Sequence, residues 1–117
     1  MTLRWEQLVV QALDPSTLGR WWCEVLDWVV VNDDPLEFEI RLSADQTPGL
    51  LFLQVSSPKR AQNRLHLDFR PDDQAQEVER ILSLGAQVAD VGQGEASWRV
   101  LLDPEGNEFC VLSSGGS

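Results

Sequence analysis

The chain has 117 residues and a formal net charge of −10, from nine Lys and Arg against nineteen Asp and Glu. This acidic balance argues against nucleic acid, whose phosphates need a basic face, and against an anionic membrane surface. Hydrophobic residues make up 43% of the chain, which is ordinary for a globular protein, so we expect a single domain over residues 1–117.

The cysteines and the N-terminal residues indicate the cellular compartment of the protein. Cys23 and Cys110 are too few for a disulfide framework and form no CxxC motif. No apolar run approaches the ~18 residues of a membrane span. Glu6 falls where a signal peptide would begin its apolar stretch. We therefore expect a reduced, cytoplasmic protein.

The first half of the chain predicts a strand, a helix and three further strands. Residues 4–11 alternate as a strand does, and Asp14-Pro15 should begin a helix, because Asp14 can cap free N–H groups and Pro15 fits the first helical position. Asp27 should end this helix as a left-handed cap. Further strands are expected at 29–31, 37–42 and 50–55.

The second half repeats this order. A strand is predicted at 64–70, a helix from Pro71-Asp72-Asp73 to Gly85, and strands at 88–91, 97–102 and 108–112. The separation between Asp14 and Asp72 equals that between Leu26 and Leu84. We therefore expect two modules, at about 3–57 and 64–113, joined by a linker at 58–63.

Three segments resemble a known family. They are the aromatic-rich helix end at 21–28, the Arg64-Leu65-His66-Leu67-Asp68-Phe69 strand, and the Asp103-Pro104-Glu105-Gly106 turn before a final strand. With the duplicated βαβββ order, they resemble the vicinal-oxygen-chelate superfamily of glyoxalases, bleomycin-resistance proteins and extradiol dioxygenases, in its glyoxalase-like domain branch. The resemblance implies an α+β fold in which two βαβββ modules form cupped mixed sheets with the helices packed outside. It also implies a homodimer.

The resemblance further implies four metal-ligand positions, which fall on Gln7, Gln54, His66 and Cys110. One imidazole, two neutral amides and one thiol are a poor set for a hard divalent cation. Glu108, two residues before Cys110 on the same face, would improve the set in a different strand register. We therefore expect no metal or other cofactor, and a divalent metal on these residues is the alternative.

The alternation of the strands predicts which side chains line the cup. The apolar wall is assigned to Trp5, Val9, Phe52 and Leu101, and the polar contacts to Gln7, Gln11, Gln54, His66, Asp68, Glu108 and Cys110. Trp98 is placed on the helix side of its strand. His66 is the candidate catalytic residue, as a base helped by Asp68, as the activator of a Cys110 nucleophile, or simply as a hydrogen-bonding group.

Two functions from different classes follow. The first is a metal-free protein that sequesters a small molecule, with its acidic field and aromatic rings favouring a cationic aromatic ligand. The alternative is a metal-dependent lyase, isomerase or dioxygenase that acts on vicinal oxygens. A structural or regulatory dimer without a ligand is a third possibility.

Overall fold

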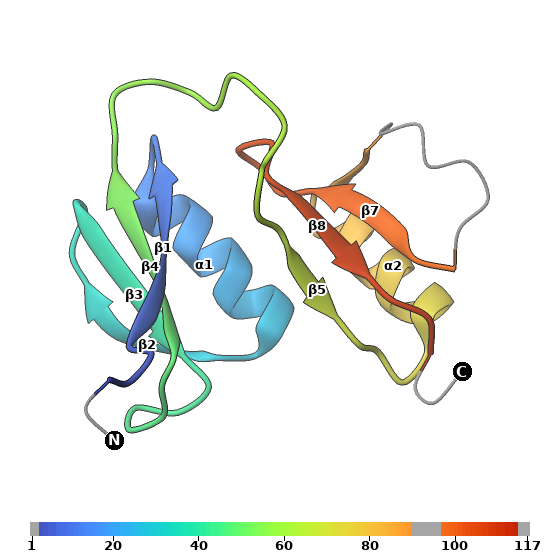
Figure 1. The fold of residues 1–117 in the computed structure, drawn as a ribbon, viewed down its shortest axis with the longest axis horizontal. Coiled ribbons are helices and arrows are strands. Elements are labelled where there is room, and N and C mark those ends of the chain that lie inside the picture. Colours follow the sequence, from blue (N-terminus) through green and yellow to red (C-terminus); the bar gives the residue numbers. More distant parts are fainter. Residues whose placement is uncertain (1–2, 90–96, 115–117) are drawn as a thin grey trace. The chain divides into compact units, whose positions relative to one another are not determined.

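The computed structural model describes residues 3–89 and 97–114, which form two compact units divided between Pro58 and Lys59 (Figure 1). Each unit has a four-stranded sheet and one helix, with strand orders β1-β4-β3-β2 and β5-β8-β7-β6. In each sheet the first strand runs parallel to the last, and the other neighbours are antiparallel. This βαβββ order, present twice, confirms the predicted α+β fold.

The first unit consists of β1 (Gln7–Ala12), α1 (Pro15–Leu26), β2 (Val29–Asp33), β3 (Glu37–Arg41) and β4 (Gly49–Gln54). The ends of α1 are those the sequence predicts. The Asp14 carboxylate accepts a hydrogen bond from the Thr17 N–H at 3.2 Å, and Pro15 occupies the first turn. Asp27 ends the helix in the left-handed region at φ 56°.

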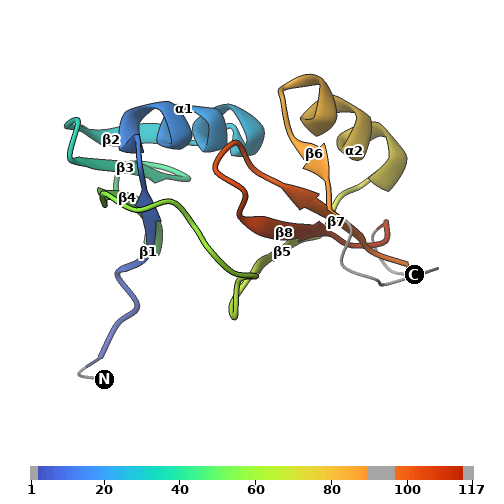
Figure 2. The ribbon, with the colours of Figure 1, turned by 90° about the horizontal axis from the view of Figure 1, so that it is seen from above.

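The core of the first unit lies between α1 and one face of its sheet (Figure 2). Strand pairing places Phe38 beside Phe52 and Ile40 beside Leu50, and all four side chains are buried. Gly19 of α1 packs against the Phe38 ring so closely that a Cβ there would overlap it. The face of the sheet that bears Phe52 is therefore covered by α1.

The second unit consists of β5 (Leu67–Phe69), α2 (Gln74–Ser83), β6 (Gln87–Val88), β7 (Arg99–Leu102) and β8 (Glu108–Val111). Asp73, the last residue of the predicted Pro71-Asp72-Asp73 start, caps α2, because its carboxylate accepts a hydrogen bond from the Gln76 N–H at 3.1 Å. Gly85 follows the helix at φ 115°, as predicted. β5 is shorter than the predicted 64–70 strand, and residues 90 and 91 of the predicted 88–91 strand lie outside the described residues.

A tight turn connects β7 to β8. The Asp103 side chain is 4% exposed and accepts hydrogen bonds from the backbone N–H groups of Glu105 and Asn107 at 2.9 and 3.0 Å. The Asn107 side-chain amide donates to the same carboxylate at 2.9 Å, and Gly106 adopts φ 85°. This network fixes where β8 begins, and hence the register of every β8 side chain that faces the site.

Within the residues that the structure describes, none of the helices has both the length and the apolarity needed to cross a membrane.

Candidate functional site

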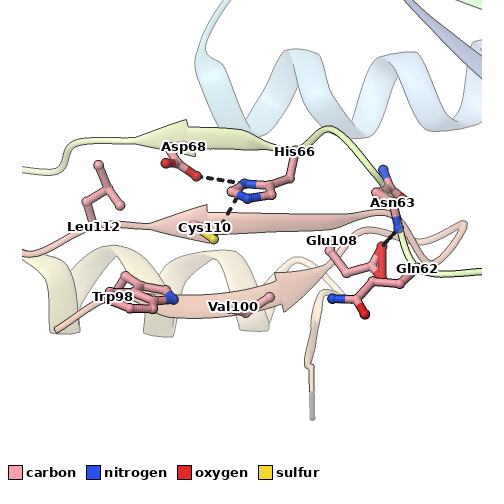
Figure 3. Close-up of a pocket in the computed structure, with 9 residues that line it drawn as sticks. All are labelled: Gln62, Asn63, His66, Asp68, Trp98, Val100, Glu108, Cys110 and Leu112. Atoms are coloured by element: carbon pink, nitrogen blue, oxygen red, sulfur yellow. Dashed lines mark hydrogen bonds and ion pairs between the residues drawn. The ribbon is translucent and has the colours of Figure 1, made fainter. Parts of the chain in front are cut away.

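A pocket of about 440 Å³ lies on one face of the second unit's sheet (Figure 3). Strand pairing places Asp68 beside Cys110 and Cys110 beside Val100, so these three side chains share that face. The pocket is lined by Gln62, Asn63, His66, Asp68, Trp98, Val100, Glu108, Cys110 and Leu112. The opposite face bears Leu101, Phe109 and Val111, each at most 2% exposed, which form the core with α2.

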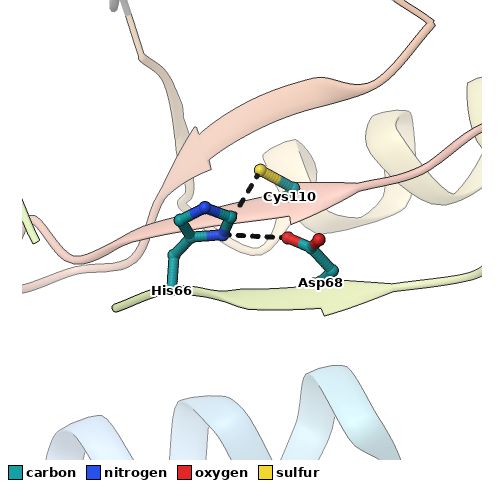
Figure 4. Close-up of side chains that lie close together, drawn as sticks. All are labelled: His66, Asp68 and Cys110. Carbon is teal, nitrogen blue, oxygen red and sulfur yellow. Dashed lines mark hydrogen bonds and ion pairs between the residues drawn. The ribbon is translucent and has the colours of Figure 1, made fainter. Parts of the chain in front are cut away.

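His66, Asp68 and Cys110 form a compact polar cluster on the pocket wall (Figure 4). Nδ1 of His66 lies 2.9 Å from Oδ1 of Asp68 and 3.8 Å from Sγ of Cys110. The His66 and Asp68 side chains are 48% and 45% exposed, whereas Cys110 is buried. The cluster therefore presents an imidazole and a carboxylate to the pocket, next to a thiol that is buried.

Cys110 is unsuited to act as a nucleophile. Burial raises the pKa of its thiol to about 11, and the charge of Asp68 and a hydrogen bond to that carboxylate act in the same direction. A nucleophilic cysteine needs the thiolate, which is scarce at neutral pH when the pKa is this high. The geometry brings Cys110 and His66 together, but the surroundings of the thiol oppose its activation.

Glu108 holds the segment that precedes β5 against the end of the pocket. Its carboxylate accepts a hydrogen bond from the Asn63 backbone N–H at 3.1 Å and lies 3.0 Å from Nζ of Lys59. Burial alone would raise the pKa of Glu108, but these two interactions outweigh it and the pKa is lowered. Glu108 is therefore an ionised carboxylate whose charge is already matched by Lys59.

Trp98 lines the pocket, contrary to the prediction that it faces the helix. Leu101, predicted to line the cup, is instead buried on the helix side of the sheet. The pairing of Val100 with Cys110 fixes the phase of β7. Trp98 is 42% exposed, whereas Leu101 is fully buried in the core. The residues of β7 are mostly apolar and show no alternation, so sequence alone could not give the phase. The predicted register of β8, in which Cys110 faces the cup, could have given the phase of β7, because the two strands are neighbours in the sheet.

In the first unit, the predicted site residues divide between the two faces of the sheet. Gln7, Val9 and Gln11 alternate on the face opposite α1, in register with Gly49, Leu51 and Leu53. Phe52 is fully buried on the helix face, and Gln54 follows it on that same face by alternation. The prediction that Phe52 and Gln54 share a face with Gln7 is therefore wrong.

Trp5 precedes β1 and is 66% exposed, and its indole N–H donates to the Gln7 carbonyl at 3.2 Å. Trp5 is not among the residues that line the second-unit pocket.

Comparison with known proteins identifies the fold. A family model described as "Glyoxalase-like domain" matches residues 7–112. A glyoxalase/bleomycin resistance protein/dioxygenase family enzyme from Burkholderia phytofirmans PsJN matches at TM-score 0.74 and 15% identity, over 93% of this chain and 97% of that one. Oxidase ChaP-H2 matches at TM-score 0.66 and 19% identity, over 99% of this chain and 100% of that one.

A bleomycin resistance determinant encoded on the transposon Tn5 matches at TM-score 0.60 and 16% identity, over 97% of this chain and 99% of that one. A search of curated proteins found no match. At these identities, the likeness to solved structures establishes the fold and leaves the activity to be argued from the site.

The four metal-ligand positions that the resemblance implies do not fit a hard divalent cation here. Gln7 and Gln54 lie on opposite faces of their sheet, so their amides do not converge. Cys110 offers a protonated thiol rather than the oxygen ligand that a hard cation prefers, and Glu108 is already paired with Lys59. The ligand atoms of His66, Asp68 and Cys110 do lie within 4.8 Å of one another, a donor set softer than such cations prefer.

Proposed function

Because the chain belongs to the glyoxalase-like domain family, we propose that it is a metal-free protein that binds and sequesters a small cationic aromatic molecule in the second-unit pocket. One observation carries the proposal. The pocket combines about 440 Å³ of space with the Trp98 ring and an Asp68 carboxylate that faces the same volume. Space, an aromatic surface and negative charge are the features that recognise such a cation.

The charge of the pocket supports a cation over an anion. Glu108 is paired with Lys59, but in the part of the chain that the structure describes no Lys or Arg forms an ion pair with Asp68. The whole chain carries a net charge of −10, which raises the local concentration of cations and lowers that of anions. An anionic ligand would meet a carboxylate that neither Lys nor Arg neutralises among the described residues, and an unfavourable field.

Calorimetric titration with two probes of similar size but opposite charge tests this function. The probes are 2-naphthylmethylammonium and 2-naphthylacetate. We expect the cation to bind with an affinity at least about tenfold higher than the anion, because the anion leaves Asp68 unpaired. Equal binding of the two probes would overturn the proposed charge preference. No heat with either would favour a structural or regulatory role without a ligand.

A metal-dependent lyase, isomerase or dioxygenase is the second candidate, and the His66, Asp68 and Cys110 cluster is the observation that favours it. Elemental analysis of untagged protein separates the two. We expect less than stoichiometric metal in both the wild type and His66→Ala. Stoichiometric metal that disappears in His66→Ala would replace the binding function with the metal-dependent one.

The family resemblance also leads us to propose a homodimer. Light scattering coupled to size-exclusion chromatography should give twice the chain mass of 13.2 kDa, and a mass equal to one chain would contradict it.

A further inference from the structure

We propose that the pocket selects cations that carry at least one N–H group and disfavours quaternary ammonium ions, because Asp68 fixes His66 with Nε2 as a hydrogen-bond acceptor facing the ligand. This inference rests on the proposed function and deepens it by naming the ligand class. It assigns Asp68 two roles, as the negative charge of the pocket and as the residue that positions His66.

The contact between His66 and Asp68 determines the tautomer. An ionised carboxylate can only accept hydrogen bonds, so the 2.9 Å contact between Nδ1 and Oδ1 requires the proton to sit on Nδ1. The Cys110 sulfur lies 3.8 Å from the same nitrogen and is a much weaker hydrogen-bonding group than the carboxylate, so the shorter contact with Asp68 decides where the proton sits. In a neutral imidazole that donates from Nδ1, Nε2 bears the lone pair.

Nε2 is available to a ligand. The two contacts of the His66 ring within the described residues both involve Nδ1, and Nε2 lies on the side of the ring away from the Asp68 carboxylate (Figure 4). The His66 side chain is 48% exposed and lines the pocket. A ligand in the pocket would therefore meet an acceptor that no protein group among the described residues satisfies.

An ammonium ion with an N–H satisfies both parts of this cluster. It donates to Nε2 of His66, and its positive charge is attracted by the Asp68 carboxylate, which lies on the other side of the imidazole ring. A quaternary ammonium ion has the same charge and the same attraction to an aromatic ring, but no proton to donate. It would remove water from Nε2 without replacing the hydrogen bond, and an acceptor left without a partner is costly.

Two probes isolate this difference. The 2-naphthylmethylammonium ion and its (2-naphthylmethyl)trimethylammonium analogue share a ring system and a charge and differ in N–H donors. At about pH 8, above the range in which imidazole ordinarily gains a proton, we expect the first to bind about tenfold more tightly. Equal affinities, or tighter binding of the trimethyl probe, would overturn the selectivity while leaving a cation-binding pocket in place. Failure of both cations to bind would instead remove the proposed function itself.

His66 variants assign the preference to Nε2. In His66→Leu, which has no acceptor, we expect the tenfold preference to fall to near unity, with the trimethyl probe changed little. His66→Gln, whose amide oxygen can accept, should restore part of it. A preference that persists in a folded His66→Leu protein would assign the selectivity elsewhere and overturn the inference.

A measurement on the wild-type protein requires no variant to fold. His66 is the only histidine in the chain, so in untagged protein the long-range proton–nitrogen correlations of imidazole report this residue alone. We expect Nδ1 to be protonated and Nε2 unprotonated, and the Nε2 resonance to shift with the ammonium probe more than with the trimethyl probe. A proton on Nε2 in the neutral free protein would overturn the inference.

Discussion

The imidazole of His66 and the carboxylate of Asp68 meet on one face of the second sheet, with Nδ1 and Oδ1 2.9 Å apart. The two residues are separated by one position, so strand alternation brings their side chains to the same side. Cys110 of β8 pairs with Asp68 of β5, and its thiol is buried next to these two side chains. The second unit therefore builds a charged, hydrogen-bonding pocket wall from its own residues.

The Asp103 turn should be a main determinant of the stability of the second unit. We expect Asp103→Ala to lower the free energy of unfolding by about 2–4 kcal/mol, because it leaves two backbone N–H groups without their acceptor in a side-chain environment only 4% exposed. Urea denaturation measures the change. Asp34→Ala, which removes one exposed hydrogen bond to the Leu36 N–H, is the control and should cost about 1 kcal/mol or less. Equal losses would contradict this assignment.

The close packing of the Phe38 ring on α1 should require a glycine at position 19. An alanine at this helical position gains about 1 kcal/mol in helix propensity, but its Cβ would overlap that ring. We expect Gly19→Ala to destabilise the protein by about 1–3 kcal/mol as measured by urea denaturation. The substitution should be less costly in a Phe38→Leu background, where the ring is absent. A stabilised Gly19→Ala protein would show that the helix and sheet are not packed this closely.

The Cys110 thiol should react slowly near neutral pH. Its pKa is raised to about 11, so in a Cys23→Ser background the rate of alkylation by iodoacetamide should rise about tenfold per pH unit to beyond about pH 10. Mass spectrometry follows the modification. A plateau at about pH 8–9 would show an ordinary thiol and would reopen the possibility of a nucleophilic pair with His66.

Glu108 should stabilise the protein in a pH-dependent way. Its pKa is lowered in the folded state, so its contribution is present above the ordinary value of 4.5 and is lost as the pH falls through the lower folded value. We expect Glu108→Gln to cost about 1–2 kcal/mol at about pH 7 and less at about pH 3.

Urea denaturation at the two pH values measures this effect. Glu37→Gln is the matched control, since the Glu37 side chain is exposed and forms no ion pair among the described residues, and it should change little at either pH. A loss for Glu108→Gln that is the same at both pH values would mean that the ion pair with Lys59 is not its source.

The sequence predicted the fold and four of the nine residues that line the pocket, because those features depend on local chemistry. Asp14 and Pro15 specify the start of α1, and the alternation of His66 and Asp68 with Leu65 and Leu67 specifies which side chains share a face. The α+β architecture followed from the family resemblance, which the duplicated order and the three segments at 21–28, 64–69 and 103–106 carry.

The errors fall where the sequence has no alternation. Phe52 lies in an apolar run from Leu50 to Leu53, so either phase places apolar side chains on both faces, and only the packing of α1 decides between them. Leu101 in β7 is ambiguous in the same way, and that ambiguity also misplaced Trp98. The sequence alone could not choose the α2 cap, because Asp72 and Asp73 are adjacent and cap equally well; in the structure the cap is Asp73.

We propose that the second-unit pocket, with Trp98 as its aromatic surface, binds a cationic aromatic molecule. Calorimetric titration of 2-naphthylmethylammonium into the wild type, Trp98→Leu and Trp5→Leu tests it most directly. We predict about a tenfold or greater loss of affinity in Trp98→Leu, from the loss of ring stacking and cation–π attraction, and an unchanged affinity in Trp5→Leu. Unchanged affinity in a folded Trp98→Leu protein, or a loss confined to Trp5→Leu, would contradict the account.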